Sequence, residues 1–427
     1  MNELSAEASA TEVVCASVAS GRRLLANAPA AKRSAVVREM ATQLRARQAE
    51  ILRANGLDLA AAGEAGMSAA LTDRLMLNAD RLQGMAVDLE RVADLPDPIG
   101  VELERRTLPE GQHLSRRRVP IGTLAVIYEA RPNVTTDIAA LALKSGNALV
   151  LRGGRETQNS NRALLACVHA ALSSQQLPTE LVQALPAQAR SEVSELLQQD
   201  RYIDLLIPRG GQALQDYCRD HARMAVVYGG IGICHLYWAS SANLERALPV
   251  VSNAKVQRPS VCNALDTLLV DQSVAAQVLP EVIAQMAPLG VSFVADSAAL
   301  AALNGRGAEH VSAAAQADFD REWLSLVLGL KVVKGIDEAM DHIAAHSTGH
   351  SDGILSDDQA ETQRFLAEVD SAAVYSNAST RFTDGSAFGL GAEVAVSTQR
   401  LHARGPMALE ALTTYKWVVE GDYSVRA

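Results

Sequence analysis

From residue 122 onward the sequence alternates short apolar runs with segments of helical pattern, joined by turns that contain glycine or proline. Such alternation is typical of parallel strands linked by helices in a doubly wound α/β sheet. It resumes after Asp266 and continues to about Tyr375, which is long enough for a second α/β domain. Two sheets are therefore expected. The runs that predict strands are residues 123–128, 148–151, 203–207, 225–228 and 267–270.

Residues 11–95 precede this region and have a different pattern. Apolar residues such as Val36, Met40 and Leu44 recur there at the three- and four-residue spacing of one buried helix face. We therefore predict a helical lead-in.

Residues 101–120 interrupt the pattern between the lead-in and the first sheet. A Pro109-Glu110-Gly111 turn separates two polar stretches, and the basic triplet Arg116-Arg117-Arg118 follows, which predicts a two-stranded ribbon. Because an isolated ribbon is only marginally stable, it should pack on its own domain or on another subunit, and the sequence leaves both open. Together with the strand pattern at residues 412–419, the ribbon favours at least a dimer formed by strand addition.

Length and composition narrow the class of protein. The chain has 427 residues, more than one domain of typical size, and lacks the roughly 18 uninterrupted apolar residues of a membrane span. Its net charge of -10 argues against nucleic acid as a main partner. The five cysteines show no CxxC, which favours a reducing cytoplasm over disulfides or zinc. Residues 1–5 show no basic region before an apolar run, so no secretory signal is expected.

Glycine pairs at the ends of predicted strands are candidates for ligand binding. Glycine lets backbone amides approach a ligand, and open α/β sheets bind ligands at the carboxyl ends of their strands. None of the pairs forms GxGxxG, and each alone is more typical of a tight turn. Three such pairs are expected in one sheet, and Arg152 and Arg209 stand beside two of them. A nucleotide or phosphate site is then as plausible as three tight turns. The pairs are Gly153-Gly154, Gly210-Gly211 and Gly229-Gly230.

Cys262 is the candidate nucleophile. Pro259 limits the helix before it, so the cysteine should lie on a loop ahead of the run at 267–270. Lys255 and Arg258 are close in sequence, and cations favour the nucleophilic thiolate. The alternative is a buried small hydrophobe, the usual role of a lone cysteine. We assign that role to the other four, Cys15, Cys167, Cys218 and Cys234.

Three histidines recur at four-residue intervals. His342, His346 and His350 could suggest a metal site, but Gly349 ends the helical pattern and no carboxylate motif accompanies them. We expect no metal, and instead a helix face or a loop on the substrate side. No GxSxG elbow supports a serine hydrolase.

Several motifs resemble those of the gamma-glutamyl phosphate reductases, also called glutamate-5-semialdehyde dehydrogenases, a branch of the aldehyde dehydrogenase superfamily. The resemblance runs from about residue 10 to the C-terminus, with the motifs in the same order. It implies a cofactor domain, a catalytic domain and an oligomerisation ribbon. The motifs are residues 129–135, 150–156, 234–237, 253–255 with 258–263, and 346–352.

The resemblance implies NADPH-dependent reduction of L-glutamyl 5-phosphate to L-glutamate 5-semialdehyde, with release of phosphate, in proline biosynthesis. Cys262 matches the nucleophile, whose thioester would be reduced by hydride from the nicotinamide. A cytoplasmic homo-oligomer, either a dimer or a tetramer, is implied. The upstream glutamate kinase is a candidate partner that would pass on the labile acyl phosphate.

The resemblance also assigns roles to residues. Asn133 matches the amide that stabilises the oxyanion together with the Cys262 N–H, and Glu322 matches the carboxylate that holds the nicotinamide ribose. Gly210 and Gly211 match the turn that meets the cofactor. Arg152 matches a position near the adenosine ribose, and either it or Arg155 could bind the 2′-phosphate of NADP. Further candidates are Gly153, Gly229 and Gly230 for the cofactor, and Arg131, Lys255, Arg258 and His350 for the substrate.

The chain departs from its relatives at informative positions. Hydrolytic aldehyde dehydrogenases have a general-base glutamate two residues before a Gly-Gly pair, where this chain has Val227; the missing base suits a reductase. Trp238, Ala239 and Asn243 depart from the family pattern and leave packing or substrate fit open. The alternatives are a hydrolytic NAD-dependent aldehyde dehydrogenase, a non-redox thiol acyltransferase and a non-catalytic nucleotide-binding or scaffold protein.

These assignments predict a division of the chain. An NADP-binding domain would comprise residues 1–100 and 121–228, and a catalytic domain that carries Cys262 would comprise residues 229–375. The oligomerisation ribbon would take residues 101–120 and 403–427. Residues 376–402 would return the chain to the cofactor domain.

Overall fold

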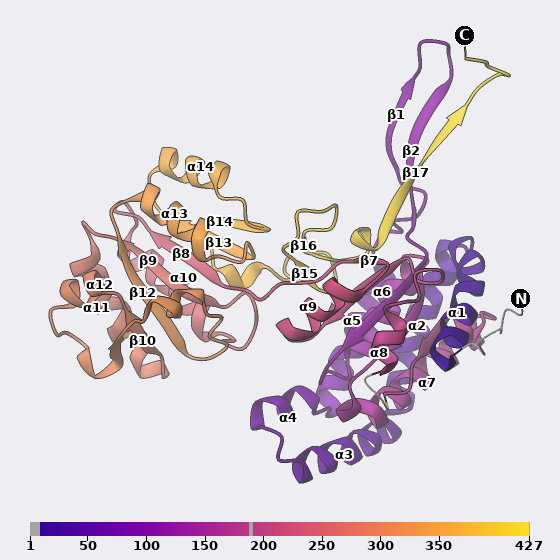
Figure 1. Ribbon diagram of the computed structural model, residues 1–427, viewed down its shortest axis with the longest axis horizontal. Helices are drawn as coiled ribbons and strands as arrows, with labels where there is room; N and C mark the ends of the chain where they lie inside the picture. The colour runs from indigo at the N-terminus through magenta and orange to yellow at the C-terminus, as the bar shows by residue number, and fades with distance from the viewer. Residues whose placement is uncertain (1–8, 188–190, 427) are drawn as a thin grey trace, which may run out of the picture. The chain divides into compact units, whose positions relative to one another are not determined.

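The computed structural model describes residues 9–187 and 191–426, so the residues to which the leader prediction applies lie outside the described part. The chain forms two compact units (Figure 1). The first comprises the chain up to Tyr228, Gly389–Ala395 and the residues from Met407 onward; the second comprises Gly229–Phe388 and Val396–Pro406. Within the described ranges, no helix is both long and apolar enough to cross a membrane.

Five helices of the described part open the first unit, and each has a buried and an exposed face. Val36, Met40 and Leu44 of the second helix are fully buried, as their spacing predicts. Ser9 and Asn78 cap the first and fifth helices by accepting backbone hydrogen bonds, which pairs donors left over at a helix start. The helices are α1 (Ala10–Ala26), α2 (Ala30–Ala46), α3 (Gln48–Glu64), α4 (Ala69–Leu75) and α5 (Ala79–Asp94).

The first sheet has five parallel strands in the order β5-β4-β3-β6-β7. The strand order reverses between β3 and β6, the kind of position where open α/β sheets bind ligands. β3 is buried along its whole length, as expected for a strand covered on both faces. The elements are β3 (Thr123–Tyr128), α6 (Val134–Lys144), β4 (Ala148–Arg152), α7 (Gln158–Ser174), β5 (Val182–Ala184), α8 (Ser191–Leu196), β6 (Leu205–Arg209), α9 (Gln212–His221) and β7 (Ala225–Val226).

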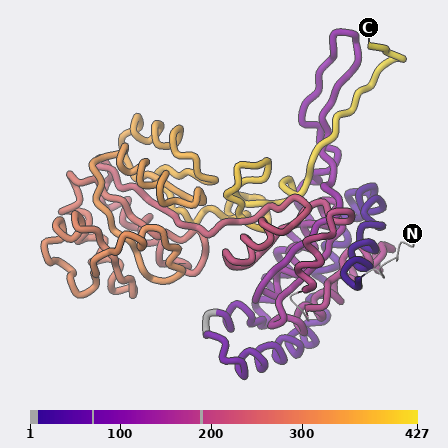
Figure 2. Tube along the Cα trace, in the orientation of Figure 1, coloured from indigo at the N-terminus to yellow at the C-terminus, as the bar shows by residue number. Residues whose placement is uncertain are grey.

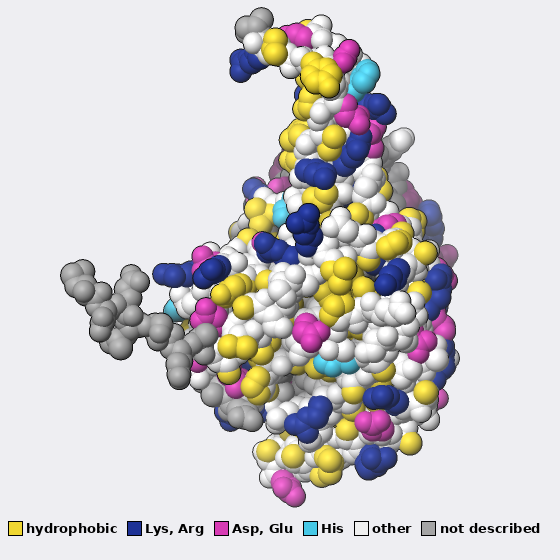
Figure 3. All heavy atoms as spheres, turned by 90° about the vertical axis from the view of Figure 1, so that its right-hand side faces the viewer, with side chains coloured by type: hydrophobic (Ala, Val, Ile, Leu, Met, Phe, Trp, Pro, Cys, Tyr) yellow, Lys and Arg dark blue, Asp and Glu magenta, His cyan; other side chains and the backbone are white. Residues whose placement is uncertain are grey.

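The ribbon combines the two strands predicted within residues 101–120 with a third strand from the C-terminal segment. β1 (Glu102–Thr107) pairs antiparallel with β2 (His113–Pro120), and β2 pairs on its other side with β17 (Thr413–Glu420). The third strand comes from the other end of the chain, and Figure 2 shows this segment running beside the hairpin. Hydrophobic and basic side chains are interspersed on its surface (Figure 3).

The second unit contains a seven-stranded sheet in the order β11-β10-β12-β9-β8-β13-β14, with every pairing parallel. This is the second sheet that the alternation predicts, and the predicted fold class is confirmed. The elements are β8 (Cys234–Trp238), α10 (Leu244–Val256), β9 (Leu265–Asp271), α11 (Ala275–Met286), β10 (Ser292–Ala295), α12 (Ser297–Leu303), β11 (Val311–Ala313), β12 (Val327–Val333), α13 (Ile336–His346), β13 (Ser351–Leu355), α14 (Gln359–Glu368), β14 (Ala373–Ser376) and the antiparallel pair β15 (Val396–Ser397) and β16 (Gly405–Pro406).

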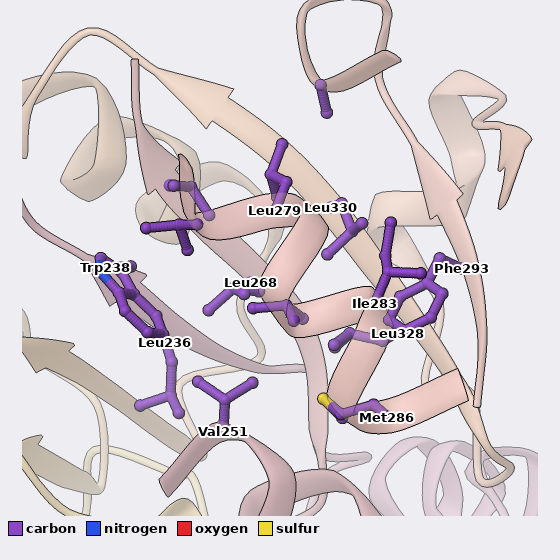
Figure 4. Packing of buried hydrophobic residues seen from close by; sticks show 14 of the residues in the cluster. Leu236, Trp238, Val251, Leu268, Leu279, Ile283, Met286, Phe293, Leu328 and Leu330 are labelled. Carbon is purple, nitrogen blue, oxygen red and sulfur yellow. The ribbon is translucent and has the colours of Figure 1, made fainter. Parts of the chain in front are cut away.

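The largest core of the second unit packs helices against the centre of this sheet. Trp238 and Leu268 of β8 and β9 lie in one cluster with Ile283 and Met286 of α11 and with Phe293 of β10 (Figure 4). Burying a large apolar side chain contributes roughly 1.5–3 kcal/mol. The cluster therefore holds the central strands firmly, and with them the loops at their ends.

Candidate active site

The loops that follow β3 and β6 lie side by side at the carboxyl edge of the first sheet, because these strands are paired and Tyr128 lies opposite Arg209. Glu129 connects the two loops. Its Oε2 accepts a hydrogen bond from the Gly211 N–H at 3.3 Å. A Cβ on Gly210 would lie 2.6 Å from the same oxygen, so a larger residue there would displace the Glu129 side chain.

The N-terminus of α9 lies beside these loops, and the Gly211 N–H there bonds to Glu129. Gly211 is its N-cap and provides no side-chain hydrogen bond, and a Cβ built on it would meet no atom within 4 Å. Backbone N–H groups at a helix start attract phosphate oxygens, and the helix dipole adds to the attraction. This turn can therefore accept the pyrophosphate of a dinucleotide.

Asn133 lies at the start of α6, in the loop that also contains Arg131. Its Nδ2 donates a hydrogen bond to Oδ2 of Asp137 at 2.8 Å, one helical turn further on. The loop enters the helix through Ala130, whose φ of 43° is left-handed and whose N–H donates to Glu156 Oε1 at 2.6 Å. The sequence analysis overlooked the Asp137 contact, although the four-residue spacing places both side chains on one helix face.

Arg152 and Arg155 follow β4 but have different surroundings. Arg152 lies 3.8 Å from Oε2 of Glu192, and both side chains are mostly buried. Burial lowers the pKa of Arg152. Arg155 is exposed. A Cβ on Gly153 would collide with Asn161, so that glycine lets β4 approach α7.

Cys262 differs from the other cysteines in accessibility. It is partly exposed, whereas the other four are buried. Burial raises the pKa of those four thiols, to about 12 at Cys15, to about 11 at Cys167 and Cys218, and well above the ordinary value at Cys234. The accessible thiol of Cys262 is thus the one suited to attack a substrate.

The loop that carries Cys262 is held from three sides. The Cys234 thiol donates to the Cys262 carbonyl oxygen at 3.2 Å. The side-chain amide of Asn263 donates to the Thr383 carbonyl at 2.9 Å, and the Thr380 hydroxyl donates to the Asn263 carbonyl at 2.7 Å. Gly232 packs so closely that a Cβ there would collide with the Cys262 carbonyl oxygen. These contacts fix the backbone at Cys262.

Asp266, four residues after Cys262, contacts three segments of the second unit. Its carboxylate accepts backbone hydrogen bonds from Cys234 at 3.2 Å and from Trp323 at 3.0 Å, and it lies 3.8 Å from Nζ of Lys255. Burial raises the pKa of Asp266 to about 6 and lowers that of Lys255. Lys255, a candidate for substrate binding, is fully buried. Its Nζ has no hydrogen-bond partner among the described residues.

Glu322, the candidate for the nicotinamide ribose, precedes β12. Its Oε1 accepts the Gly232 N–H at 3.0 Å. The next residue, Trp323, is held by Asp266. The Glu322 carboxylate and the Cys262 loop are therefore tied to the same glycine.

The sequence analysis missed Arg381, which follows Cys262 by more than a hundred residues. Its Nε donates to Gln257 Oε1 at 3.0 Å. Burial and the neighbouring Arg258 lower the pKa of Arg381, while negative groups that include the Cys262 thiolate raise it. Arg258 itself is exposed. Arg381 is therefore within electrostatic range of both Arg258 and Cys262, although it is far from them in sequence.

The motif at residues 346–352 mainly holds the structure together. Asp352 is fully buried and accepts hydrogen bonds from both the N–H and Nδ1 of His235, each at 2.9 Å, and from the hydroxyls of Ser347 and Ser371. His350, a candidate for substrate binding, is also fully buried, with Nδ1 2.7 Å from the Ser351 hydroxyl.

The third glycine pair differs from the other two in the unit to which it belongs. Gly229 and Gly230 follow the edge strand β7 but belong to the second unit. A Cβ on either would crowd Val396 or Thr398, so both positions favour glycine for packing. The three pairs thus follow three strands of one parallel sheet, β4, β6 and β7, as predicted.

The departures from the family pattern lie away from the nucleophile. Trp238 and Ala239 are buried in the second unit. Asn243 caps α10 by accepting the Arg246 N–H at 3.1 Å, a role that an acidic residue can also fill. Val227, at the position of the missing base, is buried and bonded to β6.

Comparison with known proteins identifies the class. The sequence profile of the aldehyde dehydrogenase family matches residues 3–329. The chain is 52% identical to the gamma-glutamyl phosphate reductase of Shewanella sediminis, covering 94% of this chain and 95% of that protein. It is 52% identical to the protein of the same name from Escherichia coli O1:K1, covering 94% and 96%. The crystal structure of gamma-glutamyl phosphate reductase from Thermotoga maritima is similar with a TM-score of 0.94 and 41% identity, covering 98% of this chain and 100% of that one.

The chain therefore belongs to the aldehyde dehydrogenase family and is an oxidoreductase. A nicotinamide cofactor is expected for that family, and the helix start at Gly211 fits it. Within the family the chain groups with the gamma-glutamyl phosphate reductases, as its motifs predict.

Proposed function

We propose that this chain reduces L-glutamyl 5-phosphate to L-glutamate 5-semialdehyde with NADPH, releases phosphate, and so serves proline biosynthesis. The family membership and the name that its relatives carry support the substrate. The observation that carries the chemistry is the accessible thiol of Cys262 on a fixed loop, in the electrostatic neighbourhood of Arg381.

The Cys262 thiolate would attack the acyl carbon and form a C–S bond, while the bond from that carbon to the phosphate oxygen breaks. Phosphate leaves with the electron pair and takes up a proton from solvent. Guanidinium groups match phosphate oxygens well, so Arg258 and Arg381 would stabilise the leaving group. The amide of Asn133, with the Cys262 N–H, would donate to the oxyanion.

A bound reduced nicotinamide supplies the hydride that reduces the thioester. The resulting hemithioacetal loses its C–S bond, which frees the aldehyde and restores the thiolate. Val227 provides no base to activate water, so the thioester persists until it is reduced. The Gly210-Gly211 turn would hold the pyrophosphate and Glu322 the nicotinamide ribose.

The reverse reaction gives the most direct test, because the acyl phosphate is labile. L-glutamate 5-semialdehyde and NADP are incubated with and without inorganic phosphate, and NADPH absorbance is followed. We expect phosphate-dependent NADPH formation that falls by at least about a thousandfold in Cys262→Ala. Phosphate-independent NADPH formation would favour the hydrolytic aldehyde dehydrogenase, and no signal would favour the acyltransferase or a non-catalytic protein.

The preference for NADPH is proposed to rest on the arginines after β4. Because Arg152 already pairs with Glu192 while Arg155 is exposed, Arg155→Gln should raise KM for NADP about tenfold and leave KM for NAD nearly unchanged. Arg152→Gln should have the smaller effect. Equal losses for both cofactors would remove the assignment.

We also propose that the ribbon forms a homo-oligomer, either a dimer or a tetramer. Tyr415 and Trp417 on β17 are each 48% exposed, and large exposed aromatic side chains are typical of protein interfaces. Trp417→Glu should lower the mass measured by light scattering. We propose in addition that glutamate kinase passes the labile acyl phosphate directly to this protein.

A further inference from the structure

The proposed substrate carries a positive group that none of the basic candidate residues can bind. L-glutamyl 5-phosphate has an α-ammonium group besides its carboxylate and phosphate. An ammonium group needs an acidic or carbonyl partner. The inference below rests on the proposed function and asks which carboxylate recognises this group.

Asp137 is placed beside the proposed oxyanion donor. It lies one turn after Asn133 on α6, and the hydrogen bond of 2.8 Å shows that both side chains lie on the same helix face. A ligand oxygen bound by the other N–H of Asn133 would therefore lie near the Asp137 carboxylate. The Asn133 amide bonds to one carboxylate oxygen, Oδ2.

The charge of Asp137 is poorly compensated in the described part of the chain. Desolvation raises the pKa of this carboxyl to about 7, the Asn133 hydrogen bond lowers it, Asp88 of α5 raises it, and Arg209 of β6 lowers it. A cationic ligand would stabilise the ionised form.

The dimensions of the substrate match this placement. Its α-nitrogen is four bonds from the acyl carbon and so at most about 5 Å away. The Asp137 carboxylate and an acyl oxygen that both accept from the side-chain amide of Asn133 would lie at most about 6 Å apart, since each hydrogen bond is about 2.9 Å long. We propose that Asp137 binds the α-ammonium group of the substrate while Asn133 binds its acyl oxygen.

The test compares two aldehydes that differ only in the ammonium group. The reverse reaction, with NADP and phosphate, is measured for L-glutamate 5-semialdehyde and for 5-oxopentanoate, with wild type and Asp137→Asn. The asparagine keeps an oxygen that accepts the Asn133 hydrogen bond but lacks the charge. We expect kcat/KM for the amino aldehyde to fall at least about tenfold and that for 5-oxopentanoate to change less than threefold.

Two outcomes would overturn the proposal. Equal losses on both aldehydes would show that Asp137 only positions Asn133. A wild type that does not discriminate between the two aldehydes would also refute it, and this measurement needs no variant. Failure of the proposed function itself would look different, because neither aldehyde would give phosphate-dependent turnover.

Asp88→Asn is the matched control. It removes a neighbouring negative charge that forms a surface contact with Arg91 and leaves the Asp137 carboxylate in place. The ratio of kcat/KM for the two aldehydes should stay within threefold of wild type. A large change in this control would attribute the selectivity to general negative charge rather than to Asp137.

Discussion

The two sheets present their candidate residues at opposite edges. In the first unit, Asn133 and Gly210 follow β3 and β6, at the carboxyl edge that usually binds ligands. In the second, Cys262 and Glu322 precede β9 and β12, at the amino edge. The first backbone N–H groups of the strands lie at that edge. The buried carboxylate of Asp266 accepts one of them, from Cys234 at the start of β8. The segments next to the Cys262 loop are therefore joined by a buried carboxylate, whereas the first unit presents glycine turns at its edge.

Two buried lysines show the same difference. In the first unit, Lys144 donates to the Ser34 hydroxyl at 2.7 Å and to the Ala93 carbonyl at 2.9 Å. In the second, the Asp266 carboxylate lies 3.8 Å from Nζ of Lys255, which has no hydrogen-bond partner among the described residues. Lys144 joins helices by hydrogen bonds to neutral oxygens, whereas Lys255 compensates the negative charge of Asp266 near the Cys262 loop.

Replacing these lysines should give the largest effects. Lys255→Met leaves the buried Asp266 carboxylate without its cation and should destabilise the protein by about 3–5 kcal/mol. Lys144→Met leaves only neutral acceptors and should cost about 1–3 kcal/mol. Urea unfolding at pH 8 measures both. Equal losses would contradict the distinction between the two lysines.

Lys331→Met is the control within the second unit. Its Nζ lies 3.8 Å from an oxygen of Asp296, the same separation as in the buried pair, but both side chains are partly exposed. Solvent screening should limit the loss to about 1 kcal/mol.

Two glycine replacements probe the two edges. Gly232→Ala should move the Cys262 carbonyl and lower kcat by about tenfold or more, because the added Cβ collides with it. Gly211→Ala should change the free energy of unfolding by less than about 0.5 kcal/mol, since its Cβ meets open space. It should instead raise KM for the cofactor. A Gly232→Ala enzyme with normal kcat would show that the nucleophile tolerates displacement.

The smallest expected effect is a pH-dependent change in the Tm of the Asp137→Asn variant. The pKa of Asp137 is raised to about 7 in the folded protein, so its contribution to stability is full below the unfolded pKa near 4 and is lost as the pH rises through 7. Asp137→Asn should therefore gain Tm relative to wild type between pH 6 and 8, by on the order of a few degrees. A difference that does not vary with pH would contradict the shifted pKa.

Much of the fold could be predicted because its signals are local. The run at residues 123–128 coincides with β3, and Cys262 lies on a loop before β9. The family resemblance assigned the C-terminal segment to the ribbon, but the sequence could not give its register on β2, since that pairing joins opposite ends of the chain. Arg381 was missed for the same reason: it lies in a segment predicted merely to return the chain to the cofactor domain.

The sequence by itself determined the alternation of strands and helices, the motifs and the candidate nucleophile, because each depends on residues close together in the chain. The tertiary structure alone decided that Asp266 joins Cys234, Trp323 and Lys255, and that Gly232 must lack a side chain. These contacts arise where separate strands begin at one edge of the sheet. A local sequence pattern does not determine the order of the strands in that sheet.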